Sequence, residues 1–93
     1  MLTLDIKLQI PSSVSYTFVD EDAILLNLHT NQYYLLDEVG AQLLKLLKDG
    51  KSLRESYQSL LEEYEVAPAQ LEQDILELLE NLKEQGLVEV GTA

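Results

Sequence analysis

The feature that most constrains this chain is a change of hydrophobic periodicity at Leu36. Before it, apolar side chains recur at every second position, which is typical of half-buried strands. After it, they recur at every third or fourth position, which is typical of amphipathic helices. The segment Gln32–Leu36 reads as the last strand, and Asp37 is a good N-cap for the first helix. The sequence therefore predicts an α+β, winged helix-turn-helix-like fold, with an N-terminal antiparallel sheet of three to four strands followed by three helices.

Alternation defines the other strands of the sheet. Residues 2–10 alternate almost perfectly, and Pro11 ends that run. Residues 14–18 alternate again, whereas 23–28 are apolar on both faces, as expected of a strand inside a sheet. Asn31 tolerates left-handed backbone angles, so the strand at 23–28 is predicted to turn there and form a hairpin with the last strand.

Local end signals delimit the helices. Gly50 is placed as the glycine after the first helix, and Ser52–Glu55 has the pattern of a capping box that starts the second. Pro68 suits the first position of the third helix, which Gly86 ends. Apolar stripes are expected in these helices at Val39, Leu43, Leu46 and Leu47, then at Leu53, Tyr57, Leu60, Leu61 and Tyr64, and then at Leu71, Ile75, Leu78, Leu79 and Leu82.

The charge balance argues against nucleic acid as a partner. Six Lys and Arg stand against seventeen Asp and Glu, for a net charge of −11. Such a field repels phosphate backbones and favours neutral or basic partners. No apolar run is long enough for a membrane span, and no signal peptide is visible. We expect a cytoplasmic protein without a membrane partner.

The sequence offers no set of residues for catalysis. It has no cysteine and a single histidine, His29, so neither a zinc set nor a histidine relay can be assembled. The four glycines are isolated and form no phosphate-binding loop. We therefore expect a non-enzyme with no metal site and no cofactor.

Residues 23–40 resemble the hairpin-to-helix segment of the PqqD-like family. Its members are the peptide recognition elements of pathways that modify ribosomally made peptides. The later segments, from Gly50 through the Glu-Val-Ala-Pro run to Gly86-Leu-Val, follow in matching order, so the likeness covers about residues 14–90 and leaves 1–11 as an extra strand of one domain, 1–93. The hairpin is more similar to the lasso-peptide type than to the pyrroloquinoline-quinone type.

The resemblance implies a leader-peptide-binding protein. In this family the leader of a precursor adds a strand beside the last strand of the sheet, in a groove against the third helix. Here these elements are 32–36 and 68–85. In the lasso type, the bound leader is presented to a separate cysteine protease and an ATP-dependent cyclase. The candidate peptide-binding residues are Gln32, Tyr33, Tyr34, Leu35, Leu71, Asp74, Ile75 and Leu78.

The sequence departs from the family pattern at two helix starts, and other functions stay open. Asp37 replaces the usual Asn, which is equivalent as a cap, whereas Ala67 replaces a capping Asp and weakens the third helix start. The alternatives are a peptide chaperone for a radical enzyme of the pyrroloquinoline-quinone type, a winged-helix DNA-binding regulator, and a homodimer formed by the strand at 2–10. The acidic second and third helices argue against the regulator.

Overall fold

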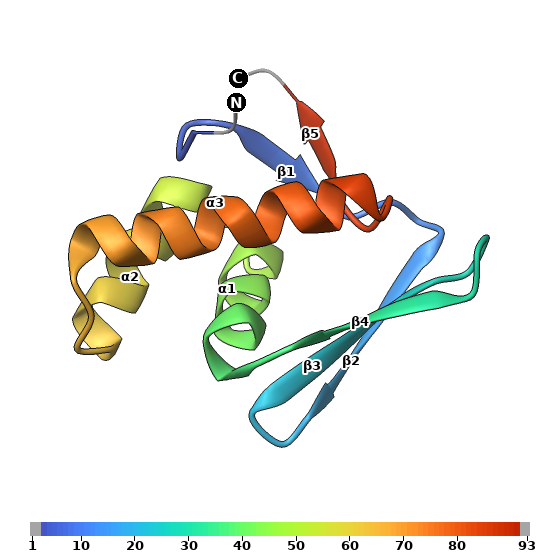
Figure 1. Cartoon of the computed structure of the whole chain (residues 1–93), viewed down its shortest axis with the longest axis horizontal. Helices are drawn as coiled ribbons and strands as arrows, with labels where there is room; N and C mark the ends of the chain where they lie inside the picture. The colour runs from blue at the N-terminus through green and yellow to red at the C-terminus, as the bar shows by residue number, and fades with distance from the viewer. Residues whose placement is uncertain (1–2, 92–93) are drawn as a thin grey trace.

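A computed structural model describes residues 3–91 of the chain (Figure 1). Strands come first and helices follow, as predicted, and one short strand ends the described chain. The elements are β1 (Lys7–Gln9), β2 (Val14–Val19), β3 (Asp22–Asn27), β4 (Gln32–Leu36), α1 (Glu38–Lys48), α2 (Leu53–Glu63), α3 (Pro68–Glu84) and β5 (Glu89–Gly91).

The main sheet has three antiparallel strands in the order β2-β3-β4. The central position of β3 confirms the expectation drawn from its apolar pattern. Leu25 lies opposite Tyr16 on one side and Tyr34 on the other, so these three side chains share the inner face. Ile24, paired with Leu35, belongs to the outer face of the sheet, which is turned away from the helices (Figure 1).

The turn between β3 and β4 is held by a side chain that the sequence did not single out. Asn31 has a φ of 60°, which confirms its predicted left-handed conformation. The Asn27 side chain accepts hydrogen bonds from the backbone N–H groups of His29 (2.9 Å) and Thr30 (3.3 Å). These bonds fix the loop, and with it the register of the hairpin.

The N-terminal strand is shorter than predicted. Residues 3–6 form a turn, only Lys7–Gln9 are extended, and Leu2 lies outside the described residues. The alternation nevertheless predicted the two faces correctly, because Leu4 is buried while Thr3 and Asp5 are exposed. The strand is limited by its partner: β1 pairs antiparallel with the three residues of β5 as a separate two-stranded sheet and does not join the main one (Figure 1).

The predicted helix ends are confirmed. The Asp37 carboxylate accepts a hydrogen bond from the Gly40 N–H (3.0 Å), and the capping box of Ser52 and Glu55 forms in both directions. Ala67, which precedes Pro68, makes no side-chain cap hydrogen bond. Caps of this kind stabilise a helix by about 1 kcal/mol each, so the start of α3 lacks a contribution that α1 and α2 have.

The core lies between the sheet and the three helices. Its fully buried large side chains include Leu25, Leu53, Leu60 and Leu79. In α1 the predicted stripe was partly wrong: Leu44 is buried along with Leu43, whereas Val39, Leu46 and Leu47 are only half-buried. The helix packs on both the sheet and α2, so its apolar surface is wider than one stripe. Among the residues described, no helix has the length and apolar character that crossing a bilayer demands.

Candidate functional site

The outer edge of β4 is unpaired within the described part of the chain. In the sheet order, β4 is hydrogen-bonded to β3 alone. The prediction of an open edge is therefore confirmed for residues 3–91. An unpaired strand edge is a template on which another strand can add.

The register shows which backbone groups face this open edge. The Leu28 N–H donates to the Ser13 carbonyl at 2.8 Å, so even-numbered residues of β3 point their backbone groups toward β2 and odd-numbered ones toward β4. Leu25 is paired with Tyr34, which places the Tyr34 N–H and C=O against β3. It follows that Tyr33 and Leu35 direct their N–H and C=O groups outward, toward a possible added strand.

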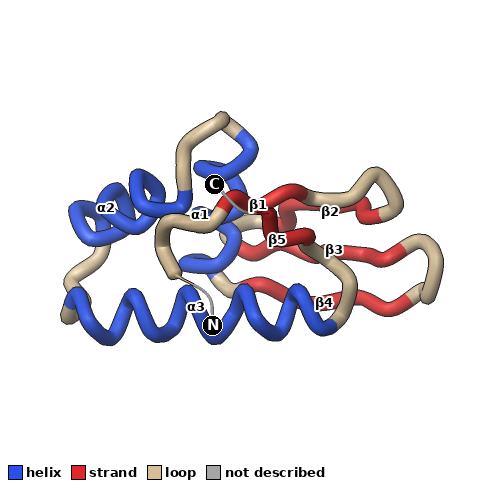
Figure 2. The backbone as a smooth tube through the Cα atoms, turned by 90° about the horizontal axis from the view of Figure 1, so that it is seen from above, coloured by secondary structure: helices blue, strands red, loops and turns tan. Residues whose placement is uncertain are grey.

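A groove of about 420 Å³ runs beside this edge. It lies between β4, the start of α1, the connection from α2 to α3, and α3 itself, which passes along the β4 side of the sheet (Figure 2). Most of the residues predicted from the sequence line it: Tyr34, Leu35, Leu71, Asp74, Ile75 and Leu78. Residues that are far apart in the sequence are thus brought together as expected.

The remaining predicted residues lie elsewhere on β4. Gln32 and Tyr33 do not line the groove, and the Tyr33 side chain is 68% exposed on the outer face of the sheet. Leu35, also outward-facing and 63% exposed, only borders the groove from the edge. Since side chains alternate along a strand, Tyr33 can reach an added strand through its backbone, while Tyr34 presents its ring on the groove side.

The sequence of this chain matches one family of known proteins. The family model described as "Coenzyme PQQ synthesis protein D (PqqD)" matches residues 22–88, which is more than half of the chain. The chain belongs to the PqqD family. The matched span runs from β3 to the end of α3 and therefore contains the edge strand and every wall of the groove.

Two solved structures of similar proteins match a larger part of this PqqD-family chain. The first, titled "TbiB1 in Complex with the TbiA(beta) Leader Peptide", is 33% identical with a TM-score of 0.82, covering 91% of this chain and 98% of the other. The second, "Lasso peptide synthetase B1 complexed with the leader peptide", is 30% identical with a TM-score of 0.80, covering 89% and 98%. The comparison with curated proteins gives no match.

Several groove residues of this PqqD-family member were missed by the sequence reasoning. Val39 and Gly40 come from the first turn of α1, and Tyr64 and Val66 come from the end of α2 and the connection after it. Tyr64 was expected on the core stripe of α2, which gave no indication that it also borders a groove. Val66 sits in a short irregular segment, where periodicity carries no information.

The charged groups of the groove are all acidic. Asp37 and Asp74 line it, and no Lys, Arg or His among residues 3–91 does. The Asp74 carboxylate accepts a hydrogen bond from the Gln70 side-chain amide at 2.8 Å, one turn earlier on α3. The groove therefore suits an apolar segment that carries neutral or basic polar groups.

More carboxylates gather beside the α1 end of the groove. The charge of Glu21 is the main reason why the pKa of Glu38 is raised, with smaller contributions from desolvation and from Glu63 and Asp22. The pKa of Tyr64 is raised chiefly by desolvation and further by Glu38. Crowded negative charge is thus the main cause of the Glu38 shift and a secondary cause of the Tyr64 shift, and a cationic side chain would relieve it.

The single histidine and the one buried serine of the described residues lie outside the groove. No cluster of three or more His, Cys, Asp and Glu among residues 3–91 has the arrangement of a metal site. His29 is exposed in the β3–β4 turn, and the buried Ser56 donates its hydroxyl to the Ser52 carbonyl within α2. What the site can do chemically is bind an extended chain through backbone hydrogen bonds and apolar contacts.

Proposed function

We propose that this protein binds the leader region of a ribosomally made precursor peptide, as a strand added beside β4, and performs no catalysis itself. The observation that carries the proposal is the coincidence of an open β4 edge with an apolar groove next to it. Two similar proteins whose structures contain a leader peptide support it.

The energetics require both the edge and the groove. Tyr33 and Leu35 offer two N–H and two C=O groups, and each hydrogen bond contributes a net ~0.5–1.5 kcal/mol. Together they supply roughly 2–6 kcal/mol, whereas micromolar binding needs about 8 kcal/mol after the cost of ordering the leader. The difference must come from apolar leader side chains placed between Tyr34, Ile75 and Leu78.

Alternation assigns these leader side chains to the groove. Every second residue of an added strand faces the inner side of the sheet, where α3 lies, and the residues between face the outer side. Asp74 stands among the apolar groove residues and is an anchor for a basic leader side chain. An aliphatic leader residue with a basic residue two positions away is the pattern that best fits this lining, because residues two apart on a strand share a face.

The pathway we favour is lasso-peptide biosynthesis. One of the two similar structures is titled as a lasso peptide synthetase B1 with its leader peptide, and the hairpin of this chain resembles the lasso type. In such a pathway the bound leader would be handed to a separate cysteine protease and an ATP-dependent cyclase. The family description also names coenzyme PQQ synthesis, so a peptide chaperone for a radical enzyme is the second candidate.

Amide hydrogen exchange on the β4 backbone tests the binding mode. The Tyr34 amide, which faces β3, should exchange slowly with or without a synthetic leader. The Tyr33 and Leu35 amides should exchange fast in the free protein and become protected only when the leader is present. If the leader binds while both edge amides keep their fast exchange, strand addition at β4 is wrong.

A proline placed on the edge gives an independent test. Leu35→Pro removes one outward N–H and, by the register, none of the bonds to β3, so it should weaken leader binding by about 3- to 10-fold relative to Leu35→Ala. The alanine variant controls for the lost side chain. Equal leader affinities for the two variants, with both proteins folded by circular dichroism, would contradict the proposal.

A further inference from the structure

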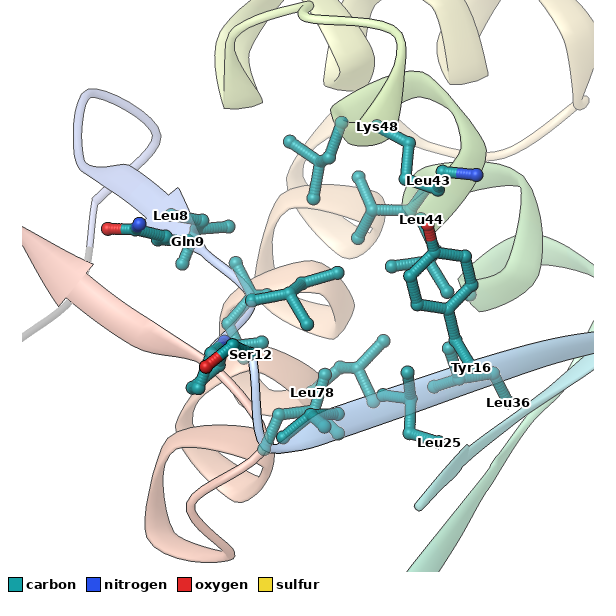
Figure 3. Close-up of a pocket in the computed structure, with 18 residues that line it drawn as sticks. Leu8, Gln9, Ser12, Tyr16, Leu25, Leu36, Leu43, Leu44, Lys48 and Leu78 are labelled. Atoms are coloured by element: carbon teal, nitrogen blue, oxygen red, sulfur yellow. The ribbon is translucent and has the colours of Figure 1, made fainter. Parts of the chain in front are cut away.

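A second cavity, of about 500 Å³, lies next to the groove. The two spaces are separated by a shared wall of residues that line both: Leu36, Gly40, Leu43 and Leu78. Figure 3 shows Leu8 and Ser12 from the N-terminal segment on one flank, and Tyr16 and Lys48 on the other, around a space lined by aliphatic side chains. Its volume falls within the range of small-molecule sites, roughly 300–1,000 Å³, which are also mostly apolar with a few placed polar groups.

The charge of this cavity is opposite to that of the groove. Although the chain has seventeen acidic residues, no Asp or Glu lines the second cavity, and Lys48 is its charged lining residue. Tyr16 lines the same cavity, and its hydroxyl is a hydrogen-bond donor. An ammonium group and a hydroxyl at an apolar cavity can both donate hydrogen bonds to an anionic head group.

The two lysines near this cavity, Lys45 and Lys48, lie over aromatic rings. The Lys48 Nζ lies 4.6 Å from the centroid of the Tyr16 ring, and the Lys45 Nζ lies 5.0 Å from that of Phe18. Among residues 3–91 the ion pair found joins Arg54 to Asp5 and involves neither lysine. A cation over an exposed ring gains only about 0.5–1 kcal/mol, so Lys48 can turn toward a carboxylate at little cost.

We propose that the second cavity binds a small amphiphile with an apolar chain and a carboxylate head, of the class of medium-chain fatty acids. The chain lies among the aliphatic side chains of Leu44, Leu82 and Val88, and the carboxylate meets Lys48 and the Tyr16 hydroxyl. Charge complementarity decides the class, because an ammonium-headed amphiphile would meet Lys48 with no carboxylate among the described lining residues to offset the repulsion.

Titration of the full chain with sodium decanoate, followed by the methyl NMR signals, tests the proposal. Decanoate, kept below its critical micelle concentration, should shift the methyl signals of Leu44, Leu82 and Val88 in a saturable way and leave those of Val66 and Leu71 in the groove unchanged. No saturable shift, or saturable shifts in the groove instead, would overturn it. The experiment needs no leader peptide, so its result is independent of the proposed function.

The contact with the carboxylate head group and the entrance of the cavity can be tested separately with matched variants. Lys48→Gln should weaken decanoate binding by roughly fivefold, as expected for one exposed ion pair, whereas Lys83→Gln, outside the cavity, should not. Ser12→Trp at the exposed rim should block the cavity, and Ser15→Trp on the outer sheet face should not. Equal binding of decyltrimethylammonium, or tighter binding of an apolar peptide through its terminal carboxylate, would reject the assigned class.

Discussion

The groove and the second cavity share a wall but differ in charge. Leu36, Gly40, Leu43 and Leu78 line both spaces. On one side of the wall the charged lining residues are Asp37 and Asp74, and on the other the charged lining residue is Lys48. The same aliphatic wall can therefore serve two kinds of ligand, because burial of apolar area is not selective while the charges at the rims are.

The difference in charge between the groove and the second cavity follows from the positions of the two ends of α1. Asp37 caps the helix and Glu38 lies in its first turn, where both charges suit the positive end of the helix dipole, and Asp37 lines the groove. Its last turn carries Lys45 and Lys48, which suit the negative end and lie over β2. The acidic first turn of α1 thus contributes negative charge to the groove, and its basic last turn contributes positive charge to the second cavity.

The strongest test of this comparison is a polar residue in the shared wall. Leu78→Asn should weaken leader binding by about 10- to 100-fold, because it buries an amide against apolar leader side chains at a cost of roughly 1–3 kcal/mol. It should weaken decanoate binding as well, since Leu78 lines both spaces. Calorimetric titration measures both affinities.

Leu76 provides the matched control on the same helix. It is half-buried like Leu78 but lines neither space, so Leu76→Asn should leave both affinities within about twofold. If Leu76→Asn lowers leader affinity as much as Leu78→Asn does, the effect is a general loss of helix stability, and the shared wall does not have the assigned role.

Gly40 is the one residue of the shared wall that has no side chain. A Cβ built there would lie 3.3 Å from the Cβ and from a Cδ atom of Leu36, and 3.4 Å from a Cδ atom of Leu78. Gly40→Val should therefore lower the free energy of unfolding by about 1–3 kcal/mol through overpacking. Gly91→Ala is the control, because nothing lies within 4 Å of a Cβ at that position. If urea denaturation shows equal stability for both variants, Leu36 and Leu78 move aside for the added side chain without a cost in stability.

How far the sequence predicts this molecule depends on the range of the interactions. Periodicity and caps are local, and they placed the hairpin at Asn31, the helix starts at Asp37 and Ser52, and the end of α3 at Gly86. The pairing of β1 with β5 joins the two ends of the chain through three residues each. A ladder that short leaves too weak a pattern to be recognised.

The candidate site was predictable only in part, for the same reason. Tyr34, Ile75 and Leu78 follow from a strand and a helix whose faces the sequence defines, together with the family resemblance. Val66 enters the groove from an irregular connection, and the second cavity depends on how closely the segment around Ser12 approaches α1 and α3. Such distances are set by packing among many side chains, which no local pattern reports.

A smaller effect separates the two roles of Asp37, as helix cap and as groove charge. Asp37→Asn keeps the cap, since Asn caps as well as Asp, and removes the charge; it should lower affinity for a leader with a nearby basic residue by up to about fivefold. Asp37→Ala removes both and should also cost about 1 kcal/mol of stability. Affinity that falls only in the alanine variant would mean that the charge does not contact the leader.

The smallest effect concerns the carboxylates beside the groove. The pKa of Glu38 is raised above its ordinary value of 4.5, mainly by the charge of Glu21. A raised folded-state pKa means that this group's contribution to stability is present below its unfolded pKa and is lost as pH rises through the folded value. Glu21→Gln should lower the pKa of Glu38, followed by carbon NMR of its carboxyl, and reduce that loss. Glu84→Gln is the control at a distant helix end.

The same signal distinguishes the two spaces once ligands are added. A leader with a basic side chain at the α1 end of the groove would add positive charge next to Glu38, and the pKa of this carboxyl should then fall toward its ordinary value. Decanoate bound at Lys48, beyond the wall, should leave the pKa of Glu38 unchanged, because the charge lies at the other end of α1 and is screened by solvent. A leader that binds tightly without moving the Glu38 titration has no cation at that end, and its specificity must then come from the apolar side chains that face Tyr34, Ile75 and Leu78.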